Sequence, residues 1–77
     1  MNALFNCSVI KNVYLRYDER VLELEITYLD ALDKRWIYRK NISDLAHTGY
    51  VKKEIETAYN TIKQALLNND KFVEIIL

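Results

Sequence analysis

The stretch KRWIYRKN, residues 34–41, sets four basic side chains around a tryptophan and a tyrosine. Proteins that bind single-stranded nucleic acid combine a basic groove with aromatic rings on which bases stack. This hypothesis assigns nucleic-acid contacts to Lys34, Trp36, Tyr38 and Lys40. Against it, the formal net charge of the chain is zero and no RNP-like motif is present. Nucleic acid is therefore the alternative partner, and not the first one we expect.

Groups that could catalyse a reaction are few. His47 is the single histidine and follows Asp44 by three residues, so the two could share one helical face as an acid–base or metal pair. Such pairs are common by chance, and a capping aspartate beside a surface histidine explains this one equally well. Cys7 has no basic neighbour in the sequence that would activate it, so we expect a buried, unreactive thiol. The sequence therefore predicts no enzyme, no cofactor, no metal site and no small-molecule substrate.

Length and composition limit the architecture and the setting. A chain of 77 residues, half of them apolar, makes one domain over residues 1–77 and is too apolar for intrinsic disorder. One cysteine cannot form an intramolecular disulfide, which favours a reducing cytoplasm. No apolar run approaches the ~18 residues of a membrane-spanning helix. We therefore expect a cytoplasmic protein without a membrane partner.

The elements that would position these groups begin with a hairpin. Apolar residues alternate with polar ones along residues 13–17 and again along 22–28, which is the period of half-buried strands. An even-length turn, of four residues in our expectation, sets Tyr17 opposite Leu22 and pairs the polar face as Arg16 with Glu23. A slip of one residue would oppose Arg16 to Leu22 and bury charge, so the register is strongly specified.

The basic stretch then finds a place as a third antiparallel strand. If Trp36 and Tyr38 join the apolar face of the hairpin, the arginines at positions 35 and 39 fall on the same face as Glu23 and Glu25. Opposite charges across neighbouring strands stabilise a sheet by roughly 0.2 to 1 kcal/mol per pair. The stretch is then half of a charge ladder, which explains its composition without nucleic acid.

The period changes to that of a helix after residue 50. Apolar residues recur at steps of three and four from Val51 to Leu66, Thr48 is a plausible N-cap, and the asparagines of NND at 68–70 favour a stop. The final KFVEIIL is apolar on both faces of a short strand. The sequence therefore predicts an α+β fold: a three-stranded meander covered on one face by one long helix, with a C-terminal strand joining the sheet (βββαβ).

One helix can cover only one face of the last strand. The other face is then open, and strands apolar on both sides are normally covered on both. Such exposed apolar patches mark interaction surfaces, although an edge strand with singly exposed apolar groups is the simpler alternative. We expect a small protein-binding module, a homodimer or a module that captures another protein, of a size that suits a phage or mobile-element modulator of a host protein. Its predicted contact residues are Phe72 and Ile76, joined by Tyr14 and Ile37 if their strands lie nearby.

Overall fold

The computed structural model describes residues 2–18, 20–29, 34–41 and 48–77. It contains one long helix, five strands and a short 3-10 turn at Cys7–Val9 within these residues. The strands and the helix are β1 (Asn2–Asn6), β2 (Ile10–Tyr17), β3 (Val21–Tyr28), β4 (Arg35–Asn41), α1 (Thr48–Leu67) and β5 (Phe72–Ile76). No helix among these residues is long and apolar enough to cross a membrane.

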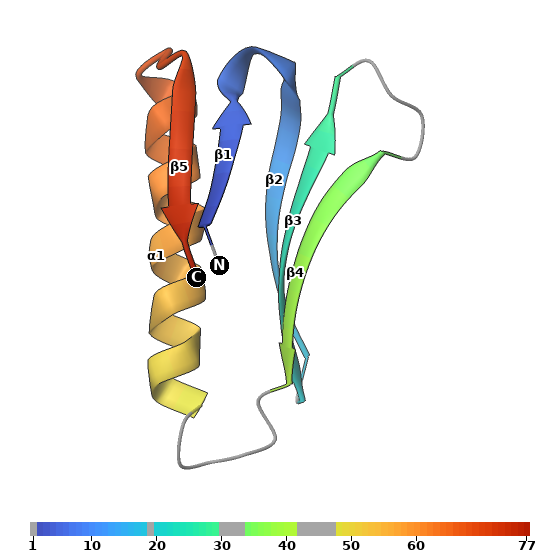
Figure 1. Cartoon of the computed structure of the whole chain (residues 1–77). Coiled ribbons are helices and arrows are strands. Elements are labelled where there is room, and N and C mark those ends of the chain that lie inside the picture. The colour runs from blue at the N-terminus through green and yellow to red at the C-terminus, as the bar shows by residue number, and fades with distance from the viewer. Residues whose placement is uncertain (1, 19, 30–33, 42–47) are drawn as a thin grey trace.

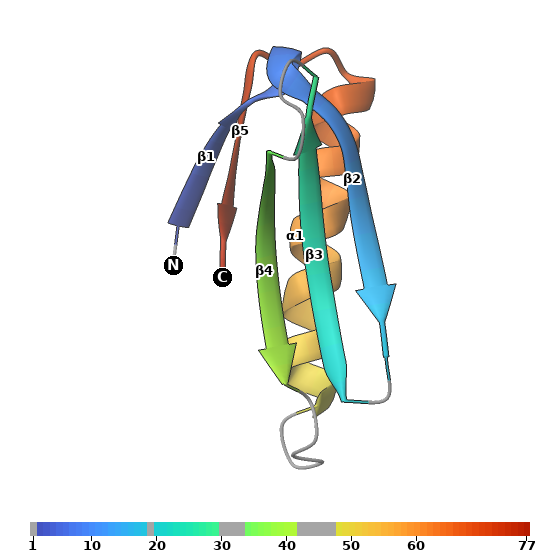
Figure 2. The ribbon, with the colours of Figure 1, turned by 90° about the vertical axis from the view of Figure 1, so that its right-hand side faces the viewer.

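The elements form two layers (Figures 1 and 2). One layer is an antiparallel three-stranded sheet in the order β2-β3-β4, as predicted. The other layer is α1 together with β5 and β1, which pair with each other in a separate two-stranded sheet. α1 packs on β2 and β3, while Phe5 of β1 meets Trp36 of β4 edge to face at 5.2 Å between ring centroids. The helix and the two-stranded sheet therefore together cover one face of the three-stranded sheet.

The predicted register is confirmed. Tyr17 lies opposite Leu22, and Arg16 opposite Glu23. On the other side of β3, Trp36 pairs with Ile26. Asp18 and Val21 exchange both backbone hydrogen bonds, at 2.9 and 3.3 Å. The hydrogen-bonded pairing therefore extends one residue pair further toward the turn than a four-residue loop would allow. Because period two fixes which face each residue occupies, the sequence specified this sheet almost completely.

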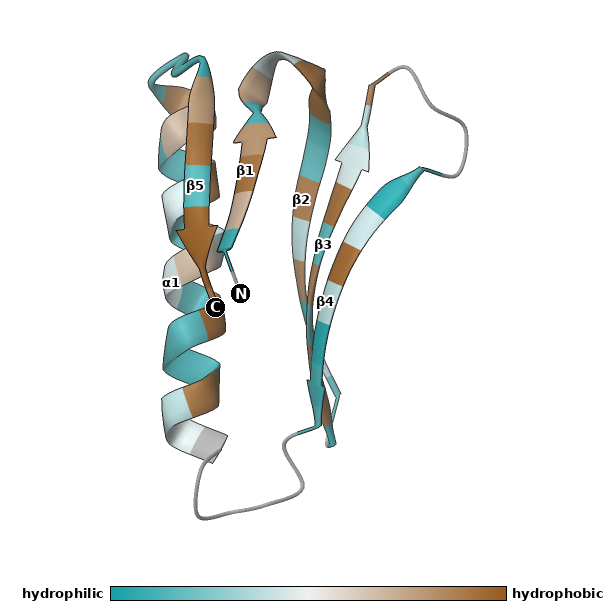
Figure 3. Ribbon diagram, viewed as in Figure 1, coloured by the Kyte–Doolittle hydropathy of each residue, from teal (hydrophilic) through white to brown (hydrophobic). Residues whose placement is uncertain are grey.

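The core lies between the two layers. Leu22, Leu24 and Ile26, which point inward from β3, are fully buried, and the buried residues of α1 recur at helical spacing. Figure 3 shows the hydrophobic bands of the strands alternating with hydrophilic ones. The most deeply buried apolar side chains are Leu22, Leu24, Ile26, Ile55 and Ile62.

The end of α1 follows the expected chemistry. Asn69 adopts a left-handed backbone with φ of 57°. The amide of Asp70 donates to the carbonyl of Ala65 at 2.9 Å, and that of Asn69 to the carbonyl of Leu66 at 3.3 Å. This pair of bonds is a Schellman motif, which asparagine accommodates better than most residues. It reverses the chain directly into β5.

One connection differs from the expectation. The last strand pairs with β1, from Asn2 opposite Ile76 to Asn6 opposite Phe72, and not with the meander. The α+β class, the meander, the long helix and the C-terminal strand are confirmed. The N-terminal strand β1 was not predicted; in the structure, Ala3, Phe5 and Cys7 alternate with the exposed residues Leu4 and Asn6.

Candidate protein-binding surface

Three large apolar side chains share the outer face of the two-stranded sheet. Leu4 is 67% exposed, Phe72 51% and Ile76 73%. Residues on alternate positions of paired strands face the same side of a sheet, and the partners of Leu4 and Asn2 on β5 are Glu74 and Ile76. We call this outer side, formed by Leu4, Phe72 and Ile76, the apolar face.

The opposite side of the same sheet explains why the apolar face is left open. Phe5, Val73 and Ile75 are buried in the core, so the sheet is already anchored through that side. Around the apolar face, Glu74 is exposed, and the ammonium of Lys71 lies over the Phe72 ring at 5.5 Å from its centroid. β5 is therefore apolar on both faces, as predicted, and only one face is covered.

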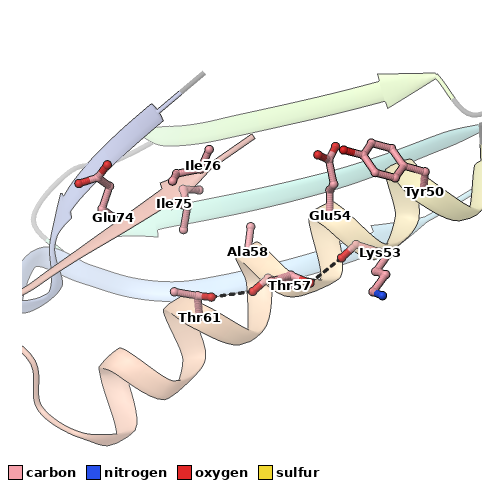
Figure 4. A pocket seen from close by; sticks show the side chains of 9 residues that line it. All are labelled: Tyr50, Lys53, Glu54, Thr57, Ala58, Thr61, Glu74, Ile75 and Ile76. Carbon is pink, nitrogen blue, oxygen red and sulfur yellow. Dashed lines mark hydrogen bonds between the residues drawn. The ribbon is translucent and has the colours of Figure 1, made fainter.

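A groove of about 490 Å³ borders the same strand, between β5 and α1 (Figure 4). Its floor includes Ala58 and Ile75. The hydroxyls of Thr57 and Thr61 donate to carbonyls of their own helix, at 2.8 Å each, so their protons are already used. We call this space the β5 groove.

The end of the β5 groove nearest the start of α1 carries a polar pair. Tyr50 is exposed and shares a hydrogen bond with Glu54. That bond and the negative charge of the carboxylate raise the pKa of the Tyr50 phenol. Lys53 also lines the groove. With Glu54 and Glu74 against Lys53, the lining carries one excess negative charge.

The other predicted contact residues lie elsewhere. Tyr14 and Ile37, 40% and 37% exposed, flank Glu25 on the outer side of the three-stranded sheet. This side belongs to the layer of the three-stranded sheet, across the core from the layer that carries the apolar face (Figure 1). The condition that these strands lie near β5 is not met, so the four predicted residues fall on two separate surfaces.

The outer side of the three-stranded sheet is an ion-pair network, which we call the ion-pair face. Glu25 is only 2% exposed, and its Oε1 accepts a hydrogen bond from Arg35 at 3.1 Å while its Oε2 lies 2.9 Å from Arg16. Arg39 pairs with Glu23 at 2.7 Å. The predicted charge ladder is therefore present, with both glutamates of β3 held by arginines from neighbouring strands.

The residues of the nucleic-acid hypothesis are divided between core and surface. Trp36 and Tyr38 are partly buried against the core and stack on each other at 6.3 Å between centroids. Lys34 is exposed, and the ammonium of Lys40 lies 5.9 Å from the centroid of the Tyr38 ring. The two rings therefore contribute to packing between the layers and are not free stacking platforms on the surface.

The groups considered for catalysis do not form a site in the described residues. Cys7 is buried, as expected, and burial together with the charge of Asp70 raises the pKa of its thiol. Asp44 and His47 lie outside the described residues. Within the described ranges, no group of three or more histidine, cysteine or acidic side chains could hold a metal ion.

The structure also adds a contact residue that sequence analysis missed. Leu4 belongs to the apolar face because β1 pairs with β5. Ala3, Leu4 and Phe5 form an uninterrupted apolar run, so the sequence contains no alternation from which the exposure of Leu4 could be predicted. No family model, curated protein or solved structure matches the chain. The surface itself is therefore the basis for any statement about function.

Proposed function

We propose that this chain is a non-enzymatic protein-binding module of the cytoplasm that self-associates through the apolar face. One observation carries the proposal: Leu4, Phe72 and Ile76 are at least half exposed on a single face of a sheet whose other face is buried. Apolar patches of this kind mark protein contacts. A two-fold axis can bring the same patch of two copies together, which is the commonest geometry of small assemblies.

Paired variants test this proposal. Ile76→Asp places a charge on the most exposed side chain of the apolar face, while Leu67→Asp places the same charge at the end of α1 on an apolar side chain that is equally exposed, at 72% against 73%. Sedimentation velocity should show association of the wild type and of Leu67→Asp, and its loss in Ile76→Asp. Circular dichroism should show both variants folded. Equal association of all three proteins, or loss in Leu67→Asp alone, would refute the proposal.

Capture of a different protein is the other outcome of the same design. If the wild type stays monomeric, affinity capture from a host extract with the same three proteins becomes the relevant comparison. A protein retained by the wild type and by Leu67→Asp, and released by Ile76→Asp, would move the interface from self-association to a second partner. The interface residues would stay the same.

A further inference from the structure

Among the residues that the structure describes, β5 pairs with β1 along one edge, and no strand pairs with its other edge. In an antiparallel pair, alternate residues exchange both backbone bonds. The Cys7 amide donates to the Lys71 carbonyl at 3.0 Å, which sets the phase of the ladder, so Val73 and Ile75 direct their backbone groups to β1. The backbone groups that point to the opposite edge are therefore those of Phe72, Glu74 and Ile76.

This second edge borders the β5 groove. The groove is lined by residues 74–76 of β5 and by the flank of α1, as Figure 4 shows. Within the described part of the chain, Glu74 and Ile76 make no backbone hydrogen bond along this edge. An edge with free donors and acceptors is a template for another strand. Beside it, Thr57, Ala58 and Thr61 are small, and the threonine hydroxyls are bonded to their own helix.

The charges that line the groove indicate which side chains such an added strand would carry. Glu74 lies between Phe72 and Ile76 on the outer side of β5 and forms no ion pair with another described residue. A strand added beside β5 would align its own alternate side chains with these three residues. Opposite charges at such cross-strand positions are favourable, and apolar pairs likewise.

We propose that the free edge of β5 binds an extended peptide segment of a partner protein, with a basic side chain beside Glu74 and apolar side chains two residues before and after it. This mode is strand addition, in which backbone bonds supply affinity and alternate side chains supply specificity. The inference rests on the proposed function, because it names the kind of segment that the β1 and β5 region recognises.

A second copy of β5 fits this edge less well. Two β5 strands paired about a two-fold axis at Glu74 would set the two glutamates directly opposite each other. Like charges at directly opposed positions destabilise a sheet. The edge therefore favours a basic segment from another protein, and it leaves the apolar face for contact between copies.

A designed peptide provides the probe. The sequence TVTKTVT carries valine, lysine and valine on one face and reads the same in both directions, so the test does not depend on parallel or antiparallel pairing. The control is TVTETVT, with the charge reversed. Titration into the ¹⁵N-labelled chain should shift the amide signals of Phe72, Glu74 and Ile76, leave those of β2 and β3 in place, and show binding of TVTKTVT at least about threefold tighter than TVTETVT.

Reversing the charge on the protein sharpens the test. In Glu74→Lys the preference should invert, so that TVTETVT binds more tightly than TVTKTVT. A TVTKTVT peptide whose two valine amides are N-methylated should bind both proteins much more weakly, because the added strand then loses two of the three amide donors that point toward β5. Absence of shifts at millimolar peptide, shifts confined to the other sheet, or equal binding of both peptides would each overturn the inference.

The outcomes separate this inference from the proposed function. Self-association that Ile76→Asp abolishes, together with no peptide binding, would refute strand addition alone. Peptide binding at the β5 edge by a chain that stays monomeric at all concentrations would refute self-association alone.

Discussion

The outer faces of the two sheets differ in how their side chains are paired and exposed. On the three-stranded sheet, Glu25 at the centre of the face is buried under Arg16 and Arg35, so that polar side chains close the surface. On the two-stranded sheet, the central Glu74 is exposed between Phe72 and Ile76. A face that satisfies its own charges has little to gain from a partner, whereas an open apolar face gains free energy from every side chain that a partner covers.

The difference between the two faces indicates which residues stabilise the monomer and which are available to bind a partner. The ion-pair face contributes contacts that exist in the monomer. The apolar face contributes nothing comparable, because its three large side chains are exposed to water. Substitutions on the first should therefore change the free energy of unfolding, and substitutions on the second should change association.

The largest effect is expected where the two layers meet. Phe5→Ala removes a buried ring that packs on Trp36 and should lower the free energy of unfolding by about 3 to 5 kcal/mol. Urea denaturation followed by Trp36 fluorescence measures it, and Phe5→Leu supplies a milder variant if the alanine variant does not fold. The neighbouring Leu4→Ala, on the exposed side of the same strand, should change stability by less than about 0.5 kcal/mol. Similar losses for Leu4 and Phe5 would contradict the assignment of inner and outer sides.

The two central glutamates give the next comparison. Glu25→Ala removes a buried carboxylate with two arginine partners and should cost about 1 to 3 kcal/mol. Glu74→Ala, at the centre of the other outer face, should be neutral within about 0.5 kcal/mol. Both values come from chemical denaturation. Equal effects would show that the two faces do not differ as described.

The free energy of unfolding should depend on alkaline pH through Cys7, which lies between β1 of one sheet and β2 of the other. The pKa of the Cys7 thiol is raised in the folded state by burial and then by Asp70. The folded chain therefore keeps the thiol proton where the unfolded chain loses it, and the resulting stability is complete below the ordinary thiol pKa and declines as pH rises through the folded-state value. Cys7→Ala should flatten this decline in denaturation curves measured across alkaline pH. An unchanged slope would assign the decline to other groups.

The smallest effect is expected when single-stranded nucleic acid is added and the fluorescence of Trp36 is measured. Because Trp36 packs against Phe5 and Tyr38, single-stranded oligonucleotides at low salt should leave its emission unchanged. Quenching that weakens steeply with salt would indicate phosphate and base contacts. That result would restore the hypothesis built on Lys34, Trp36, Tyr38 and Lys40.

Sequence alone was sufficient for the meander and insufficient for the pairing of the ends. In β2, β3 and β4, period two and opposite charges agree on one register, and the chain needs only short connections to reach it. The pairing of β1 with β5 joins the two ends of the chain, and no local pattern specifies such a contact. The helix stop at Asn69 was predictable because few residues tolerate its left-handed backbone.

The candidate site was predictable to the same extent. Exposure of Phe72 and Ile76 follows from the double apolar pattern of KFVEIIL and a single covering helix. The neighbours of these residues depend on which strand accepts β5. Tyr14 and Ile37 were included on the condition that their strands lie near β5, and the structure places those strands in the other sheet. Leu4 was overlooked.

The most direct test of the central claim is the molar mass of the wild-type chain in solution, measured by light scattering over a wide range of concentrations. Burial of the apolar face between two copies predicts a mass that rises with concentration from 9.2 kDa toward twice that value, and a constant 9.2 kDa for Ile76→Asp. A wild-type mass that stays at 9.2 kDa throughout, or a dimer that Ile76→Asp leaves intact, would contradict it.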